Sequence, residues 1–169
     1  MSDDRAFMEA TLPHVEVVYR VARHVATDRA AAQDLVQETY LRAYTKFSTH
    51  RGSNTRAWLI AICLNAARSR ARQERRRPVE LRGELPEVTD PGPDVFEVAA
   101  AEIDREVLRA ALARLGEQQR TALVLMDIGG LTAAEAAQVL GCPRGTVLAR
   151  AHRGRRALMQ LLVSERQDR

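Results

Sequence analysis

The sequence predicts an all-α protein made of two small helical domains joined by an acidic, proline-containing linker. Three observations lead to this prediction. Hydrophobic residues make up 46% of the 169 residues but aromatic residues only 4%, which suits helices packed through Leu, Val and Ala better than a β-sandwich. Apolar residues recur at helical spacing, and no stretch alternates as a half-buried strand would. Prolines and acids together divide the chain near its middle.

The N-terminal block contains two helical patterns in succession. After Pro13, the apolar positions are Val15, Val18, Tyr19, Ala22 and Val25. Asp28 then offers a side chain suited to cap a second helix. The apolar stripe of that second helix comprises Ala32, Leu35, Val36, Thr39, Tyr40, Ala43 and Phe47. This spacing is typical of an amphipathic helix with one face in a core.

A third helix is expected from Thr55, after a loop over residues 48–54. Trp58 falls at helical spacing with Leu59 and Ile62, which favours a core position over a stacking platform for a base. The helix ends in the segment 68–77, which holds six Arg and one Glu. Such a run either contacts phosphates or is a solvated helix end.

The linker is predicted over residues 79–96, between a domain at 1–78 and a domain at 97–169. Residues 78–93 contain four prolines and two glycines, which disfavour a continuous helix. Charge changes at the same places. Residues 1–78 carry a net charge of +6, residues 79–104 a net charge of −7 and residues 105–169 a net charge of +5. Two basic blocks suggest two surfaces for a polyanion.

The C-terminal block contains a helix-turn-helix pattern between residues 132 and 156. Thr132 and Glu135 form a capping-box sequence, and Gly141 supplies a residue that tolerates positive φ at the turn. Ala137 and Val147 have the sizes needed where two such helices cross. Since the second helix is rich in Arg, we interpret the pattern as a DNA-binding unit. An ordinary helical hairpin with a basic solvated face is the alternative.

Other function classes find little support in the sequence. Cys63 and Cys142 belong to no ligand cluster, and the four His are scattered, so neither a metal nor another cofactor is expected. We expect Cys63 in the core, Cys142 exposed at the turn, and the histidines at the surface or at helix ends. No catalytic motif points to an enzyme. Without a signal sequence or a long apolar run, the expected location is the cytoplasm.

Two motifs in this order resemble those of a known family. The segments 34–39 and 54–59, with Asn65, resemble region 2 of the extracytoplasmic-function (ECF) sigma factors of bacterial RNA polymerase. The segments 131–147 and 152–156 are similar to region 4 of the same family. The resemblance covers nearly the whole chain. It implies a factor that binds core polymerase and directs promoter-specific initiation in a stress or environmental response.

The resemblance also implies roles for residues of the first domain. A polar helix face would bind the clamp helices of the β′ subunit, and its residues are Asp34, Gln37 and Glu38. A solvated face with an intrahelical Glu38–Arg42 pair is the alternative. Residues 48–56 would capture a flipped base of the −10 element, which offsets part of the cost of strand separation. The residues expected to contact −10 DNA are Asn54, Arg56, Asn65, Arg68 and Arg72.

The second domain would read the −35 element as a duplex. Base-edge contacts are expected from Arg144, Thr146 and Arg150, and phosphate contacts from Arg153, Arg155 and Arg156. Leu148 and Ala149 stand where the family often has a Lys-Ser pair, and Ser69 replaces a common aspartate. Base preference therefore does not transfer from the family.

Three kinds of partner are implied: core RNA polymerase, through the β′ clamp helices and β; promoter DNA; and an anti-sigma factor. The linker would pass near the RNA exit path of the polymerase. One alternative is a stand-alone operator-binding regulator, which would need no polymerase. Another is a helical protein-interaction adaptor, which would show no promoter preference. The face formed by Asp34, Gln37 and Glu38 separates the sigma factor from the regulator.

Overall fold

A computed structural model describes residues 2–76 and 105–167 of the chain. In these two ranges the backbone forms helices and the turns between them, with no strand. The predicted all-α class is therefore confirmed. The linker predicted at 79–96 lies outside the described residues.

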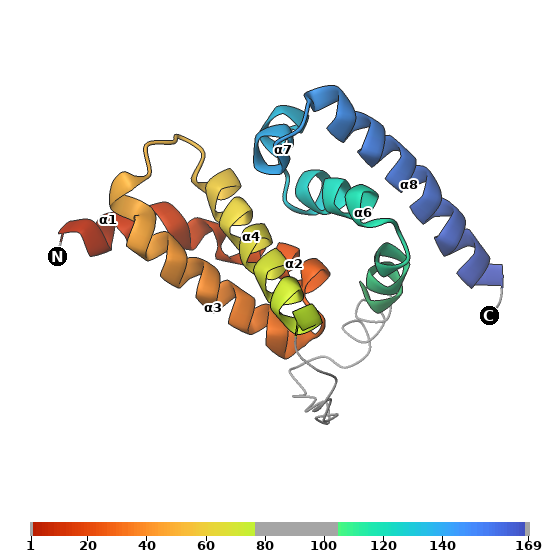
Figure 1. Cartoon of the computed structure of the whole chain (residues 1–169), viewed down its shortest axis with the longest axis horizontal. Coiled ribbons are helices and arrows are strands. Elements are labelled where there is room, and N and C mark those ends of the chain that lie inside the picture. The colour runs from red at the N-terminus through yellow and green to blue at the C-terminus, as the bar shows by residue number, and fades with distance from the viewer. Residues whose placement is uncertain (1, 77–104, 168–169) are drawn as a thin grey trace.

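The first group of helices comprises α1 (Ser2–Thr11), α2 (Val15–Val25), α3 (Arg29–Lys46) and α4 (Thr55–Arg76). Short 3-10 turns at Leu12–His14 and Phe47–Thr49 follow α1 and α3. Helices α2, α3 and α4 pack against one another (Figure 1). The predicted stripe of α3 faces this contact: Ala32, Leu35, Thr39 and Ala43 are buried, and Val36, Tyr40 and Phe47 are partly buried.

Local capping explains where α3 begins. Asp28 has an extended backbone, and its carboxylate accepts a hydrogen bond from the Ala31 amide at 2.8 Å. The side chain thereby satisfies an amide that has no partner within the helix. The cap predicted at Asp28 is confirmed.

The helix α1 was not expected, because the sequence-based reading placed the first helix after Pro13. Its buried aromatic side chain, Phe7, lies among the rings of Tyr40, Tyr44 and Phe47, at centroid distances of 6.5, 5.2 and 5.3 Å. All three contacts are edge-to-face, a favourable geometry for aromatic rings. The aromatic residues that contact Phe7 lie far from it in the sequence, so no local sequence pattern predicts this helix.

The second group begins with a helix described from residue 105 to 113. It continues with α6 (Glu117–Leu123), the π-helical turn η3 (Val124–Ile128), α7 (Ala133–Leu140) and α8 (Arg144–Gln167). Both α6 and α7 pack against α8. At the α6–α8 crossing, a Cβ on Gly154 would lie 3.1 Å from Leu123, so a small residue allows the two helices to approach closely.

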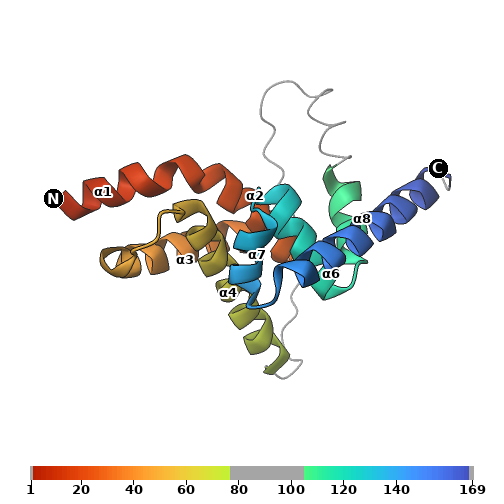
Figure 2. The ribbon, with the colours of Figure 1, turned by 90° about the horizontal axis from the view of Figure 1, so that it is seen from above.

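The two groups pack against each other and share one buried cluster. Helix α2 contacts η3, and α4 contacts α7, while α1 and the end of α8 extend to opposite ends of the molecule (Figures 1 and 2). A Cβ added to Gly129 of the second group would lie 3.1 Å from Cδ1 of Ile60 of the first. This close contact joins α4 to the turn between η3 and α7.

Candidate nucleic-acid interface

Helices α7 and α8 form the helix-turn-helix that the sequence predicts. The Thr132 hydroxyl accepts from the Glu135 amide at 3.2 Å, and the Glu135 carboxylate accepts from the Thr132 amide at 2.8 Å. Gly141 ends α7 with φ of 64°. Ala137 and Val147 are buried at the crossing, with 9% and 0% exposure. The expected capping box, turn and apolar anchor are all confirmed.

The arginines of α8 differ in how exposed their side chains are. Arg144, Arg153 and Arg156 are exposed, and Thr146 and Arg150 are half-buried near the start of the helix. Arg150 lies 3.8 Å from the Cys142 sulfur. The exposed guanidinium groups form a surface that can contact phosphates, and the first turn of α8 is free to enter a groove.

Arg155 is the exception among these arginines. Its guanidinium donates two hydrogen bonds to the Asp127 carboxylate, at 3.0 and 2.7 Å. This bidentate pair ties α8 to η3, and the hydrogen bonds to Asp127 raise the pKa of Arg155. A phosphate would compete with Asp127 for this guanidinium.

Asn54 and Arg56, two of the expected −10 contacts, lie at the junction between the helix groups. The Asn54 side-chain oxygen accepts from the Ala57 amide at 3.0 Å and caps α4. Its amide nitrogen donates to Glu135 of α7. Arg56 donates to the Gly130 carbonyl oxygen at 3.0 Å. Sequence reasoning had no means of finding these contacts, because they join residues of different domains.

The remaining expected −10 residues lie along α4. Asn65 and Arg72 are exposed, and Arg72 is 3.4 Å from the Ser69 hydroxyl. Arg68 is half-buried and lines a pocket together with Arg150 of the other group. One candidate −10 residue and one candidate −35 residue are thus neighbours in this arrangement.

Trp58 is half-buried and packs against the shared core, in line with the expected core position. One face of its indole is covered by His50, with ring centroids 4.0 Å apart and planes at 13°. His50 also follows the last residue of the 3-10 turn Phe47–Thr49 as its C-cap, in line with the helix-end position expected for the histidines. Gly52 leaves room for it, since a Cβ there would lie 2.9 Å from the imidazole.

The polar face of α3 divides into two parts. Asp34 and Gln37 are exposed. Glu38 is half-buried and binds Arg42 at 2.5 Å and Arg70 of α4 at 2.6 Å. The intrahelical pair considered from the sequence is therefore present, and a second arginine joins it. Asp34 and Gln37 remain available to a protein partner.

The cysteines and histidines do not gather into a site. Cys63 is buried as expected, and burial raises the pKa of its thiol to about 11. Cys142 is half-buried rather than exposed, because the turn and Arg150 cover it. His24 is half-buried in the last turn of α2, a helix end as expected. Within residues 2–76 and 105–167, no three His, Cys, Asp or Glu residues are placed to hold a metal ion.

None of the helices in the described part of the chain is both long enough and apolar enough to cross a membrane.

Comparison with known families assigns both helix groups. Residues 12–77 match the family described as Sigma-70 region 2, and residues 105–158 match Sigma-70, region 4. The ECF RNA polymerase sigma factor EcfG of Rhodopseudomonas palustris is 38% identical over 132 residues, spanning 78% of this chain and 71% of that protein. SigC of Mycobacterium tuberculosis, also an ECF RNA polymerase sigma factor, is 37% identical over 157 residues, spanning 91% of this chain and 80% of its own.

Two solved structures resemble this one over most of their length. The sigma factor RpoE, in its complex with the anti-sigma factor NepR from Bartonella quintana, matches with a TM-score of 0.78 and 29% identity, over 94% of this chain and 97% of that one. CnrH, in complex with the cytosolic domain of CnrY, matches with a TM-score of 0.70 and 27% identity, over 95% of this chain and 90% of its own.

Proposed function

Because the chain belongs to the ECF family of RNA polymerase sigma factors, we propose a division of promoter recognition between its two helix groups. The protein is a sigma factor for promoter-specific transcription initiation and not an enzyme. In our proposal residues 1–78 bind core polymerase and recognise and melt the −10 element. Residues 97–169 bind the −35 element, and residues 79–96 link the two parts.

The helix-turn-helix carries the −35 part of the proposal. Its capping box and left-handed turn fix α8 relative to α7, and the exposed start of α8 bears Arg144 beside Thr146. These side chains, with Arg150, read base edges in the major groove. Arg153, Arg155 and Arg156 lie further along α8 and hold phosphates, which positions the helix without selecting a sequence.

The −10 part rests on α4 and the loop before it. Asn65, Arg68 and Arg72 lie on one helix, where they follow the backbone of a separated strand. Asn54 ends the loop that receives an extruded base, and Arg56 lies beside it in the first turn of α4. Since both hydrogen-bond to the second helix group, −10 recognition requires the two groups to move apart.

Core polymerase binds the exposed side of α3 in this proposal. Asp34 and Gln37 contact the β′ clamp helices directly. Glu38 contributes by holding α3 against α4, because both of its oxygens already accept from arginines.

We also propose an anti-sigma factor as a partner, and the cytoplasm as the place where the protein acts on polymerase. The likeness to RpoE extends over both helix groups, and that protein was solved with the anti-sigma factor NepR. An arrangement in which the second group holds the −10 loop suits a protein that a partner keeps inactive.

The experiment compares two α8 variants bound to core polymerase on a library of −35 duplexes. Arg144→Gln is expected to relax the sequence preference at one position and to weaken binding to the best site about tenfold or more. Arg153→Gln is expected to weaken binding to all sequences alike. It should also reduce the slope of log affinity against log salt concentration by about one. Arg5→Gln, on the exposed part of α1, is the control. Equal sequence profiles and salt slopes for all three variants would contradict the assignment.

A further inference from the structure

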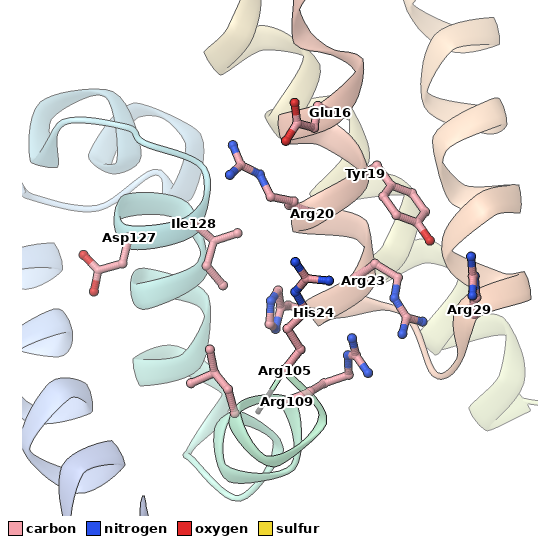
Figure 3. Close-up of a pocket in the computed structure, with 11 residues that line it drawn as sticks. Glu16, Tyr19, Arg20, Arg23, His24, Arg29, Arg105, Arg109, Asp127 and Ile128 are labelled. Atoms are coloured by element: carbon pink, nitrogen blue, oxygen red, sulfur yellow. The ribbon is translucent and has the colours of Figure 1, made fainter. Parts of the chain in front are cut away.

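A basic pocket of about 510 Å³ lies where the two helix groups meet on the side of α2 (Figure 3). Helix α2, the start of α3, the helix at 105–113 and the turn η3 contribute to it. The basic side chains that line it are Arg20, Arg23, His24, Arg29, Arg105 and Arg109. Figure 3 shows those of α2 and those of the helix at 105–113 pointing toward the same space.

Two acids line this pocket among the described residues, and one of them is engaged. Asp127 accepts both guanidinium hydrogen bonds of Arg155, which lies outside the pocket. Arg109 pairs with Glu106 on its own helix. Within the described part of the chain, Arg20, Arg23 and Arg29 have no ion pair. Glu16 is the other acid among the described residues that line the pocket, so positive charge prevails among them.

Two polar atoms at the pocket have no hydrogen-bond partner among the described residues. They are Nε of Arg109 and Nδ1 of His24, and both are buried. Burial, together with the charges of Arg109 and Arg23, lowers the pKa of His24 to about 4. A local positive potential therefore acts on this imidazole, and a bound anion would relieve it.

We propose that this pocket binds a small anion with several phosphate groups, such as the oligophosphate of a nucleotide. Guanidinium groups match phosphate oxygens in pairs, and a site built from Arg favours phosphate over a single carboxylate. The volume lies within the usual range for small-ligand sites. The ring of Tyr19 lines the same pocket and offers a surface against which a base can stack.

A bound ligand would stabilise the packed arrangement of the two helix groups. Its contacts come from α2 and α3 on one side and from residues 105–128 on the other. A ligand that binds only the packed arrangement stabilises it by mass action. None of the residues proposed above for polymerase or promoter contact lines this pocket, so the inference stands apart from the proposed function.

The test measures binding of ATP and of inorganic tripolyphosphate to the full chain by isothermal titration calorimetry. Binding in the micromolar range is expected for both. Arg20→Gln with Arg23→Gln is expected to weaken it at least about tenfold, because two charge-assisted contacts are lost. Arg5→Gln with Lys46→Gln removes the same charge from exposed positions of the first helix group and should change affinity less than about twofold.

Two further measurements keep the outcome clear. Arg29→Gln, at the exposed start of α3, tests the pocket if the α2 variant does not fold. The His24 ring resonances are expected to shift when ATP is added to the wild-type protein. Tighter binding of ATP than of tripolyphosphate supports a nucleotide, and equal binding supports recognition of phosphate alone.

Three results would overturn the proposal. The first is no binding of either anion at millimolar concentration. The second is equal weakening in the control variant, which would show diffuse attraction to a basic protein. The third is tighter binding of an oligoglutamate peptide than of either phosphate compound, which would identify the pocket as a docking site for an acidic protein segment.

Discussion

Glu38 differs from the other polar residues of its helix face because its carboxylate pairs with two arginines. Arg42 of α3 and Arg70 of α4 both bind its carboxylate, and the Glu38 side chain is only 25% exposed. Asp34, one turn earlier, is exposed. One sequence pattern thus contains a residue that holds the domain together and a residue that is available to a partner.

Substitutions at these two positions are expected to separate the roles. Glu38→Gln should lower the free energy of unfolding by about 1–2 kcal/mol, because two charge-assisted hydrogen bonds lose their charge in a partly screened site. Asp34→Arg should change it by less than about 0.5 kcal/mol, yet weaken binding to core polymerase. Urea denaturation and a polymerase-binding titration measure the two effects. Wild-type affinity in folded Asp34→Arg would count against the polymerase face.

His24 makes stability depend on pH. Its pKa is about 4 in the folded protein, against 6.5 for a free imidazole. Between these values the unfolded chain binds a proton that the folded protein does not, so acid favours unfolding. The contribution of neutral His24 to the free energy of unfolding is fully present above pH 6.5 and is lost as pH falls toward 4.

The expected loss over this range is about 1–2 kcal/mol, less than the full shift implies because solvent partly screens the ring. His24→Gln should remove this part of the pH dependence, since glutamine does not titrate. His152→Gln, at an exposed position of α8, should retain it. Denaturation curves between pH 7 and 4 provide the measurement. Parallel curves for wild type and His24→Gln would show that another group is responsible.

At the scale of single elements, the turn between α7 and α8 depends on one glycine. Gly141 adopts φ of 64°, while a Cβ there would meet nothing within 4 Å. The cost of a side chain at this position is therefore conformational and not a steric clash with the rest of the protein.

Gly141→Ala is expected to lower the free energy of unfolding by about 1–2 kcal/mol, the cost of a left-handed conformation in a residue with a side chain. Gly145→Ala is the matched control. Gly145 lies in the first turn of α8, also has open space around its Cβ position, and has no positive φ. This control should be neutral or stabilising by up to about 1 kcal/mol, since alanine favours helix. Equal effects of both substitutions on thermal unfolding would contradict this reading of the turn.

The elements found from the sequence are those specified by nearby residues. The Asp28 cap, the α3 stripe and the Thr132–Glu135 box each need only a few consecutive turns of chain, so they were predictable. Helix α1 was missed because Phe7 depends on aromatic residues of α3. The contacts of Asn54 and Arg56 were missed for a related reason, since their partners belong to the other helix group.

At the scale of the whole molecule, Glu135 connects the two helix groups. One of its oxygens accepts from the Thr132 amide and completes the cap of α7. The other accepts from the Asn54 side chain in the loop before α4. The Glu135 carboxylate therefore caps the first helix of the helix-turn-helix and also binds the loop proposed to contact −10 DNA.

Glu135→Gln is expected to keep the cap but break the contact between the groups. A glutamine oxygen can still accept from Thr132, but its amide group then faces the Asn54 amide, donor against donor. The groups should separate more readily, which raises the radius of gyration in small-angle X-ray scattering. Affinity for single-stranded −10 DNA should increase severalfold. Glu9→Gln, on exposed α1, is the control. Unchanged scattering and unchanged DNA affinity would refute a restraining role for this contact.

Promoter-specific initiation by this chain is tested most directly by transcription with purified core polymerase on a library of candidate promoters, with and without the protein. We expect transcripts that require the protein, start at fixed sites, and share sequence blocks near −35 and −10. A substitution at Arg144 should change the selected −35 block, whereas a substitution at Asn65 should weaken initiation at all −10 sequences alike. Absence of such transcripts, together with binding of the protein alone to a specific duplex, would contradict the account and identify an operator-binding regulator instead.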